Sequence, residues 1–136
     1  MNRRDFQELA RVRLDEARTL LAAGRFDGSY YLSGYAVECA LKACITKKTR
    51  RYEFPPRAVG DMYTHDLPRL IRAAGLDKAL EQAVAADNEF ADRWTTAQKW
   101  SADSRYVRYT ERQAQKLYDA LTNRRTGVLR WVRRHW

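Results

Sequence analysis

The chain has 136 residues, of which 45% are hydrophobic and 32% charged, with three prolines and six glycines. This length and composition are typical of one globular domain and exclude collagen-like and low-complexity proteins. No apolar run approaches the roughly 18 residues that a membrane-spanning helix needs, and no apolar stretch follows the first arginines. We therefore expect neither a membrane span nor a secretion signal.

The two cysteines give a prediction about the redox compartment. Cys39 and Cys44 stand five positions apart in one helical pattern. Their Cα atoms would lie beyond disulfide reach, at roughly 7 Å. We therefore predict two reduced thiols in the core of a cytoplasmic protein.

Charge is the first indication of function. The chain has 26 Lys and Arg against 17 Asp and Glu, a net charge of +9, and such a chain attracts polyanions, most commonly nucleic acid. Residues 124–136 hold five arginines and no acid, residues 47–51 form a second basic stretch, and residues 77–92 are acidic. Each basic stretch is also compatible with a simpler interpretation, a solvated helix face.

Two long helices are predicted at the start of the chain. Residues 3–23 carry apolar side chains at the three-and-four spacing of one buried stripe, and Gly24 supplies the helix stop. Residues 27–48 form the second helix, with Asp27 as a plausible N-cap. Because only about four residues join these helices, they should pack as an antiparallel hairpin.

The next segment is predicted to be irregular and then helical again. Residues 49–63 contain Pro55-Pro56, which cannot lie inside a helix. Thr64 is the expected N-cap of a short helix that has Pro68 in its first turn and ends at Gly75.

The rest of the chain is predicted to be helical around one polar, aromatic loop. Residues 77–100 show weaker periodicity, consistent with two helical pieces, and residues 101–109 form the loop. Residues 110–136 are expected to form one long helix, in which Gly127 costs up to about 1 kcal/mol relative to alanine. The predicted fold is all-α: an up-and-down bundle of four to six helices, with a Pro-containing loop after the second helix, in a single domain over residues 1–136.

Two motifs make the first half of the chain more specific. Leu20 and Leu21 precede an aromatic-rich helix in which Ala-Val-Glu at 36–38 is followed by Leu-Lys-Ala at 41–43. After the variable loop, residues 63–67 read Tyr-Thr-His-Asp-Leu. Together these motifs resemble the HEPN family (higher eukaryotes and prokaryotes nucleotide-binding).

The resemblance covers residues 13–74 well and implies a helical bundle that is usually a dimer. HEPN domains often act in RNA metabolism, as toxins of toxin–antitoxin pairs or in phage defence. Many are metal-independent endoribonucleases, whereas others are binding modules. They are commonly encoded beside a minimal nucleotidyltransferase, whose Asp-x-Asp metal site does not occur in this sequence.

The resemblance also implies a catalytic pair. HEPN nucleases use an arginine and a histidine, four to six residues apart, on the last core helix, and Arg130 and His135 have this spacing. A base that takes the 2′-OH proton and a cation that holds the phosphate suffice for RNA cleavage. On a straight helix the two side chains would point about 140° apart, so they converge only if the helix bends or a second subunit completes the site. A solvated or interface end of the chain is the alternative.

The other titratable candidates have structural interpretations. His65, beside Thr64 and Asp66, is predicted to belong to a helix start and to bond to a neighbour. Glu38 and Lys42 are spaced for a helix ion pair that orients helices or a dimer. Two distant histidines without a cysteine cluster predict no metal site, and we find no cofactor motif.

Residues 100–109 interleave aromatic and arginine side chains and have two open interpretations. The segment would stack bases and grip phosphates, or it would pin the last helix to the bundle with Trp100 and Tyr106 as lids. The residues that we expect to bind nucleic acid are Arg105, Arg108, Arg124, Arg125, Arg133 and Arg134.

Three functions remain open from the sequence. The first is a HEPN-type protein associated with RNA or nucleotide, in one form a metal-independent endoribonuclease of a toxin–antitoxin or defence module. The second is a non-catalytic adaptor that binds a nucleotidyltransferase partner. A DNA-binding protein ranks third, because no helix-turn-helix is visible and charge alone gives nonspecific, salt-sensitive binding. The resemblance implies that the protein is a homodimer.

Overall fold

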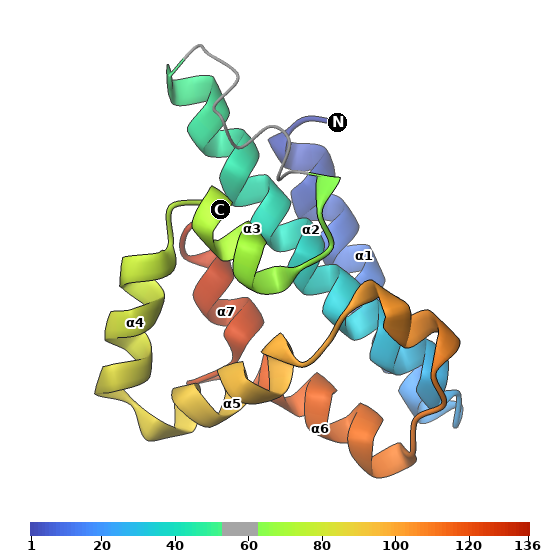
Figure 1. Cartoon of the computed structure of the whole chain (residues 1–136). Helices are drawn as coiled ribbons and strands as arrows, with labels where there is room; N and C mark the ends of the chain where they lie inside the picture. Colours follow the sequence, from blue (N-terminus) through green and yellow to red (C-terminus); the bar gives the residue numbers. More distant parts are fainter. Residues whose placement is uncertain (53–62) are drawn as a thin grey trace.

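The computed structural model describes residues 1–52 and 63–136, and all regular structure in them is helical (Figure 1). The elements are α1 (Arg3–Ala22), α2 (Phe26–Tyr52), α3 (Leu67–Ala73), α4 (Asp77–Ala86), α5 (Asn88–Gln98), the 3₁₀ helix η2 (Ala102–Tyr106), α6 (Glu111–Thr122) and α7 (Val128–Arg133). The predicted all-α class is confirmed. The described residues contain one α-helix more than the expected range, because the segment predicted as one last helix forms two helices, α6 and α7.

Helices α1 and α2 form the predicted antiparallel hairpin (Figure 1). Asn2 and Asp5 cap the start of α1 reciprocally, and Gly24, with φ of 75°, supplies the left-handed turn after its end. The buried Ser29 hydroxyl donates to the Ala17 carbonyl at 2.8 Å and ties the two helices together.

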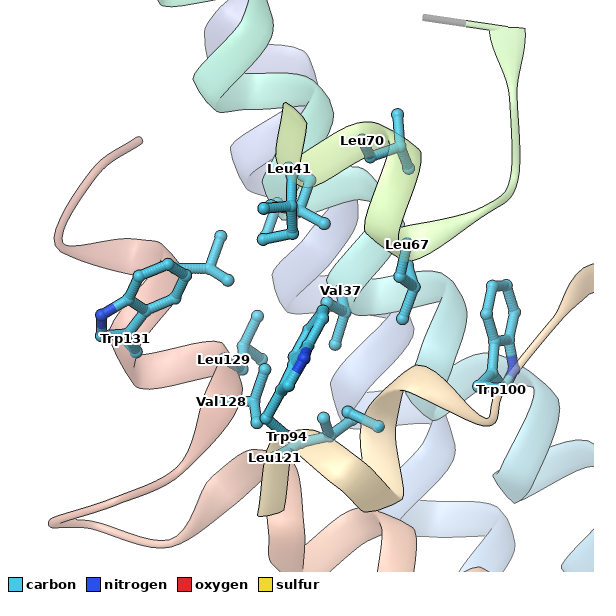
Figure 2. Close-up of a cluster of buried hydrophobic side chains, with 14 of the residues drawn as sticks. Val37, Leu41, Leu67, Leu70, Trp94, Trp100, Leu121, Val128, Leu129 and Trp131 are labelled. Carbon is cyan, nitrogen blue, oxygen red and sulfur yellow. The ribbon is translucent and has the colours of Figure 1, made fainter. Parts of the chain in front are cut away.

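Helix α2 is the centre of the bundle, packing against α1, α3, α6, α7 and η2. Val37 and Leu41 are fully buried, as the predicted inner face requires. Figure 2 shows their side chains meeting others that come from neighbouring elements, Leu67 among them. Burial of each such side chain contributes about 1.5–3 kcal/mol to the stability of the fold, so the packing of α2 stabilises the core.

The prediction of one long helix over residues 110–136 is wrong. The chain leaves the helix after Thr122 and begins α7 at Val128. The Asn123 side chain accepts hydrogen bonds from the backbone N–H groups of Arg125 and Thr126, which holds the chain in a turn. Gly127 precedes α7 as its N-cap, so this glycine marks a helix start rather than a weak position inside a helix.

Two predicted helix caps are also corrected. The N-cap of α3 is Asp66, whose Oδ1 accepts from the Arg69 N–H at 2.9 Å, whereas Thr64 accepts from the N–H of Asp66. Helix α2 already begins at Phe26, so Asp27 lies in its first turn. Its carboxylate contacts Arg108 and Tyr109 instead.

The middle of the chain follows its predictions more closely. Pro68 lies in the first turn of α3, and Gly75, with φ of 72°, follows the end of that helix. The weakly periodic segment is indeed two helices, α4 and α5. Helix α2 continues beyond its predicted end to Tyr52, and Pro55-Pro56 lies outside the described residues.

The cysteine prediction is confirmed in its structural part, since Cys39 and Cys44 are free and buried. Burial raises the pKa of each thiol to about 12, so neither is a ready nucleophile. No helix in the described part of the chain has the length and apolar character to cross a membrane. The cytoplasmic location stays a prediction.

Candidate functional site

Helix α7 presents two different faces. Val128, Trp131 and Val132 are buried and anchor the helix in the core, where Figure 2 shows Val128 and Trp131 beside the α2 side chains. The opposite face is basic and in water. It carries the exposed side chains of Arg130, Arg133 and Arg134.

The two predicted catalytic residues lie differently on this segment. Arg130 is exposed on α7, whereas His135 follows the helix and its ring packs on Trp131, with ring centroids 4.9 Å apart. The backbone N–H of His135 donates to the Val132 carbonyl at 2.9 Å. Within the described residues no interaction joins Arg130 to His135. A single copy of the chain therefore leaves these side chains apart.

The end of α7 is held against α1. The Arg3 guanidinium donates to the Trp136 carbonyl at 2.6 Å. Arg11 and Arg133 lie over the Trp136 ring, 5.1 and 5.2 Å from its centroid. Such cation–π contacts contribute about 0.5–1 kcal/mol each at exposed positions. Arginines of α1 and α7 thus converge here, and His135 sits in packed structure rather than in a frayed end.

His135 has the electrostatic character of a proton acceptor. Partial burial lowers its pKa, and the positive charges of Lys47 and Arg134 lower the pKa further. The imidazole is therefore neutral at neutral pH, with a nitrogen lone pair able to take a proton. Lys47 belongs to the predicted basic stretch 47–51, and the structure brings this lysine near His135.

Arg124 and Arg125 lie in the turn between α6 and α7, and both are exposed. Arg125 pairs with Glu89 of α5 at 3.0 Å, in a bridge exposed on both sides. An ion pair in water contributes little, so a phosphate would compete with Glu89 readily.

Residues 100–109 are pinned to α2 at both ends. Trp100 is buried against Gly34, and its indole faces the ring of Tyr31. At the other end Tyr109 stacks on Tyr30 with ring centroids 3.7 Å apart, and its backbone N–H donates to Asp27. The pinning interpretation is therefore confirmed for Trp100.

The same interpretation is wrong for Tyr106, whose relative exposure is 78%. Tyr106 is the last residue of η2 and lies in water, with Cζ of the Arg105 guanidinium 5.1 Å from the centroid of its ring. Arg108 is also exposed, although its Nε pairs with Asp27 Oδ2 at 2.9 Å. The fixed ends of the segment thus hold an exposed Arg-Tyr pair and a second arginine between them.

A buried polar cluster joins α2 to the start of α3. Glu38 is 1% exposed, and its Oε1 accepts from Lys42 Nζ at 2.8 Å, which confirms the predicted ion pair. The same oxygen lies 2.9 Å from Nδ1 of His65. The predicted bond from His65 to a neighbour is confirmed, but its partner is distant in sequence. No spacing rule would have found this contact, although both residues lie in the motifs quoted above.

No group of three or more metal-ligating side chains occurs among the described residues.

The comparison with known families covers nearly all of the chain. The model of the HEPN domain matches residues 4–135. The chain belongs to the HEPN family. No curated protein and no solved structure matches it significantly. The HEPN match extends well beyond residues 13–74, through the C-terminal arginines.

Family membership gives this HEPN protein a broad function. HEPN domains have nucleotide- or RNA-associated roles and often form dimers. The basic, exposed face of α7 and the exposed side chains of η2 are the parts of this HEPN fold suited to a nucleic acid.

Proposed function

We propose that this chain is an RNA-associated HEPN protein that binds phosphates on its basic C-terminal face and cleaves RNA there without a metal. The observation that carries the proposal is the partly buried His135, whose ring packs on Trp131 and whose pKa is lowered by burial and by the positive charges of Lys47 and Arg134. Arg133 and Arg134 are exposed on the same segment. A base and exposed cations thus lie within one short C-terminal segment.

In the proposed reaction His135 takes the proton of a ribose 2′-OH. The 2′ oxygen then attacks the adjacent phosphorus, a bond from O2′ to phosphorus forms, and the bond from phosphorus to O5′ breaks. The O5′ leaving group takes up a proton, which gives a 2′,3′-cyclic phosphate and a 5′-hydroxyl. Arg130 stabilises the negative charge that develops on the phosphate.

We propose that Arg130 and His135 of different subunits form each site in a homodimer. The support is their separation within one chain, where no interaction joins them. Mixing Arg130→Ala with His135→Ala subunits would then restore one intact site in each mixed dimer, or about a quarter of wild-type activity at equal amounts. A mixture as inactive as its components would exclude a shared site.

The remaining predicted arginines would extend the binding surface for RNA. Arg105 and Arg108 flank the exposed Tyr106, on which a base can stack, and Arg124 and Arg125 are exposed in the turn before α7. Removal of one arginine that binds a phosphate should reduce the slope of log binding constant against log salt concentration by about the value for one released counterion.

Incubation of the purified protein with total RNA in EDTA tests the proposal. Cleavage should persist in EDTA and disappear in His135→Ala. Arg133→Ala with Arg134→Ala should weaken RNA binding, whereas Arg18→Ala with Lys78→Ala, which removes two exposed cations elsewhere, should not. Absence of cleavage at every protein concentration would refute the nuclease activity. Equal RNA binding by both double variants would refute the assignment of the basic face as the RNA site.

A second function, a non-catalytic adaptor for a minimal nucleotidyltransferase, is favoured by the same separation of Arg130 and His135. In that case the basic face docks an acidic surface of the partner. Arg133→Ala with Arg134→Ala should then abolish capture of the nucleotidyltransferase in a pull-down, while His135→Ala leaves it intact. Unchanged capture by the arginine variant would count against the adaptor.

A further inference from the structure

A pocket separate from the C-terminal face opens beside His65. Its volume is about 360 Å³, and it lies between residues 64–68, which lead into α3, and residues 98–103, which join α5 to η2. This volume is at the small end of the range for ligand pockets, enough for one nucleobase-sized group. We call it the His65 pocket.

His65 is fixed in this pocket by buried structure. Glu38 holds the Nδ1 atom, and Lys42 holds Glu38, so two residues of α2 orient a ring that is itself 53% exposed. With Nδ1 engaged, Nε2 and the ring face are the parts of His65 available to a ligand. A side chain that is locked by a buried partner binds with little loss of rotamer entropy.

The charges around the pocket favour a ligand with N–H donors over a phosphate. Asp66 and Asp103 line it with a single lysine, Lys99, so the pocket does not share the cationic character of the α7 face. A carboxylate accepts two parallel N–H bonds, which is the pattern that guanine offers on its Watson–Crick edge. The indole Nε1 of Trp100, which also lines the pocket, is buried without a partner among the described residues.

A second hollow, the α5–α6 groove, is a neighbour of the His65 pocket. It has a volume of about 1080 Å³ and shares one lining residue, Lys99, with the pocket. Its charged lining consists of four cations, Arg93, Lys99, Arg112 and Lys116, and three acids, Asp92, Glu111 and Asp119. The cations along this open groove suit the phosphates of a single strand. The two hollows therefore meet at Lys99, and the groove offers cations to a strand whose base enters the pocket.

We propose that the His65 pocket binds one nucleobase with N–H donors on its Watson–Crick edge, guanine above all. The ring stacks on His65 and the donors reach Asp103. The proposal deepens the RNA-associated function by naming a base-reading site, and it rests on that function only in treating RNA as one source of the base. A free guanine nucleotide is the other source.

Proton NMR tests the pocket directly, because the chain has only two histidines. His65→Asn and His135→Asn assign the two sets of imidazole signals, and GMP, UMP and ribose 5-phosphate are then titrated into the wild-type protein. The His65 signals should shift and saturate with GMP, shift less with UMP and stay in place with ribose 5-phosphate. The His135 signals should not follow the same saturation curve.

A substitution that keeps the size of the side chain and removes its charge identifies the residue that reads the base. Asp103→Asn should weaken GMP binding about tenfold, the loss of one charge-assisted hydrogen bond. Asp77→Asn, at an exposed acid in the first turn of α4, is the matched control and should leave GMP affinity unchanged. Glu38→Gln tests positioning, since it should reduce the GMP-induced shift of His65 while the protein keeps its helical circular dichroism.

The outcomes separate this proposal from the proposed function. A His65 pocket that ignores GMP at millimolar concentration, or that responds equally to ribose 5-phosphate, overturns the base site even if RNA is cleaved at His135. Binding of GMP that survives Arg133→Ala with Arg134→Ala upholds it even if the C-terminal face binds no RNA. A pentanucleotide with one central guanine, bound more tightly than GMP and weakened by Arg112→Ala, identifies RNA as the source. Equal affinities identify the free nucleotide.

Discussion

Replacement of Gly34 by alanine tests how tightly residues 100–109 are pinned to α2. A Cβ atom at Gly34 would overlap Cγ and Cδ2 of Trp100, well inside the roughly 3.5–4.0 Å of ordinary carbon contacts. Helix propensity alone predicts that alanine stabilises a helix interior by about 1 kcal/mol relative to glycine. Packing and propensity therefore predict opposite signs.

The packing cost is the larger of the two effects. A tryptophan buries roughly 150–250 Å², so displacing half of the Trp100 side chain exposes about 100 Å². At about 25 cal/mol per Å² this costs about 2.5 kcal/mol, and subtracting the propensity gain leaves a net destabilisation of about 1.5 kcal/mol. With a urea m-value of about 2 kcal/mol/M, the unfolding midpoint of Gly34→Ala should fall by about 0.75 M.

Gly28, in the same helix, supplies the control. A Cβ at Gly28 meets only the flexible end of Leu20, at 3.1 Å, so Gly28→Ala should match or exceed the wild-type stability. Urea unfolding followed by circular dichroism gives both values, and tryptophan fluorescence reports whether Trp100 moves toward water. A Gly34→Ala variant as stable as Gly28→Ala would refute the argument that Trp100 seals α2 at this glycine.

Three further predictions concern the titratable groups. Lys42→Ala leaves the buried Glu38 carboxylate without its ammonium partner, so thermal or urea unfolding should show that the free energy of unfolding falls by about 3 kcal/mol. Adding Glu38→Gln to the Lys42→Ala chain should recover part of this loss. Because the pKa of His135 is lowered in the folded state, the unfolded state binds its proton first as the pH falls below about 6.5. Stability should therefore decrease from pH 7.5 to 5.5, and by less in His135→Asn; an equal decrease would show that His135 does not contribute. With pKa values of about 12, Cys39 and Cys44 should resist a thiol-specific disulfide reagent at pH 8 until the chain unfolds, so fast labelling of the native protein would contradict their burial.

The sequence was most informative where one helical period dominated. In α2 the spacing of Val37 and Leu41 predicted a buried face, and both are fully buried. Gly24 and Gly75 predicted helix ends, and both have positive φ angles there. These features depend on residues a few positions apart, which is the range over which backbone preference and periodicity act.

The C-terminal helix shows how the same rule fails. Val128 and Val132 continue the helical spacing of the apolar residues before Asn123. The spacing of apolar residues therefore gives no sign of the turn between the two helices. The turn is stabilised instead by a side chain, because Oδ1 of Asn123 accepts hydrogen bonds from the backbone N–H groups of Arg125 and Thr126. An asparagine followed closely by glycine was the local signal for this break, and the regular apolar spacing outweighed it.

The two histidines mark the limit of sequence reasoning about the site. His135 could be linked to Arg130 only by spacing, and spacing carries no information on what lies across the helix or on a second subunit. His65 is held by Glu38, 27 positions earlier, because α2 and the start of α3 pack together through the core. That packing creates an oriented imidazole at a pocket that neither histidine motif alone predicts. Within one chain, His65 is therefore the histidine whose orientation is set by a partner, Glu38. Comparing His65→Asn with His135→Asn in nucleotide binding and in RNA cleavage decides which histidine has which role.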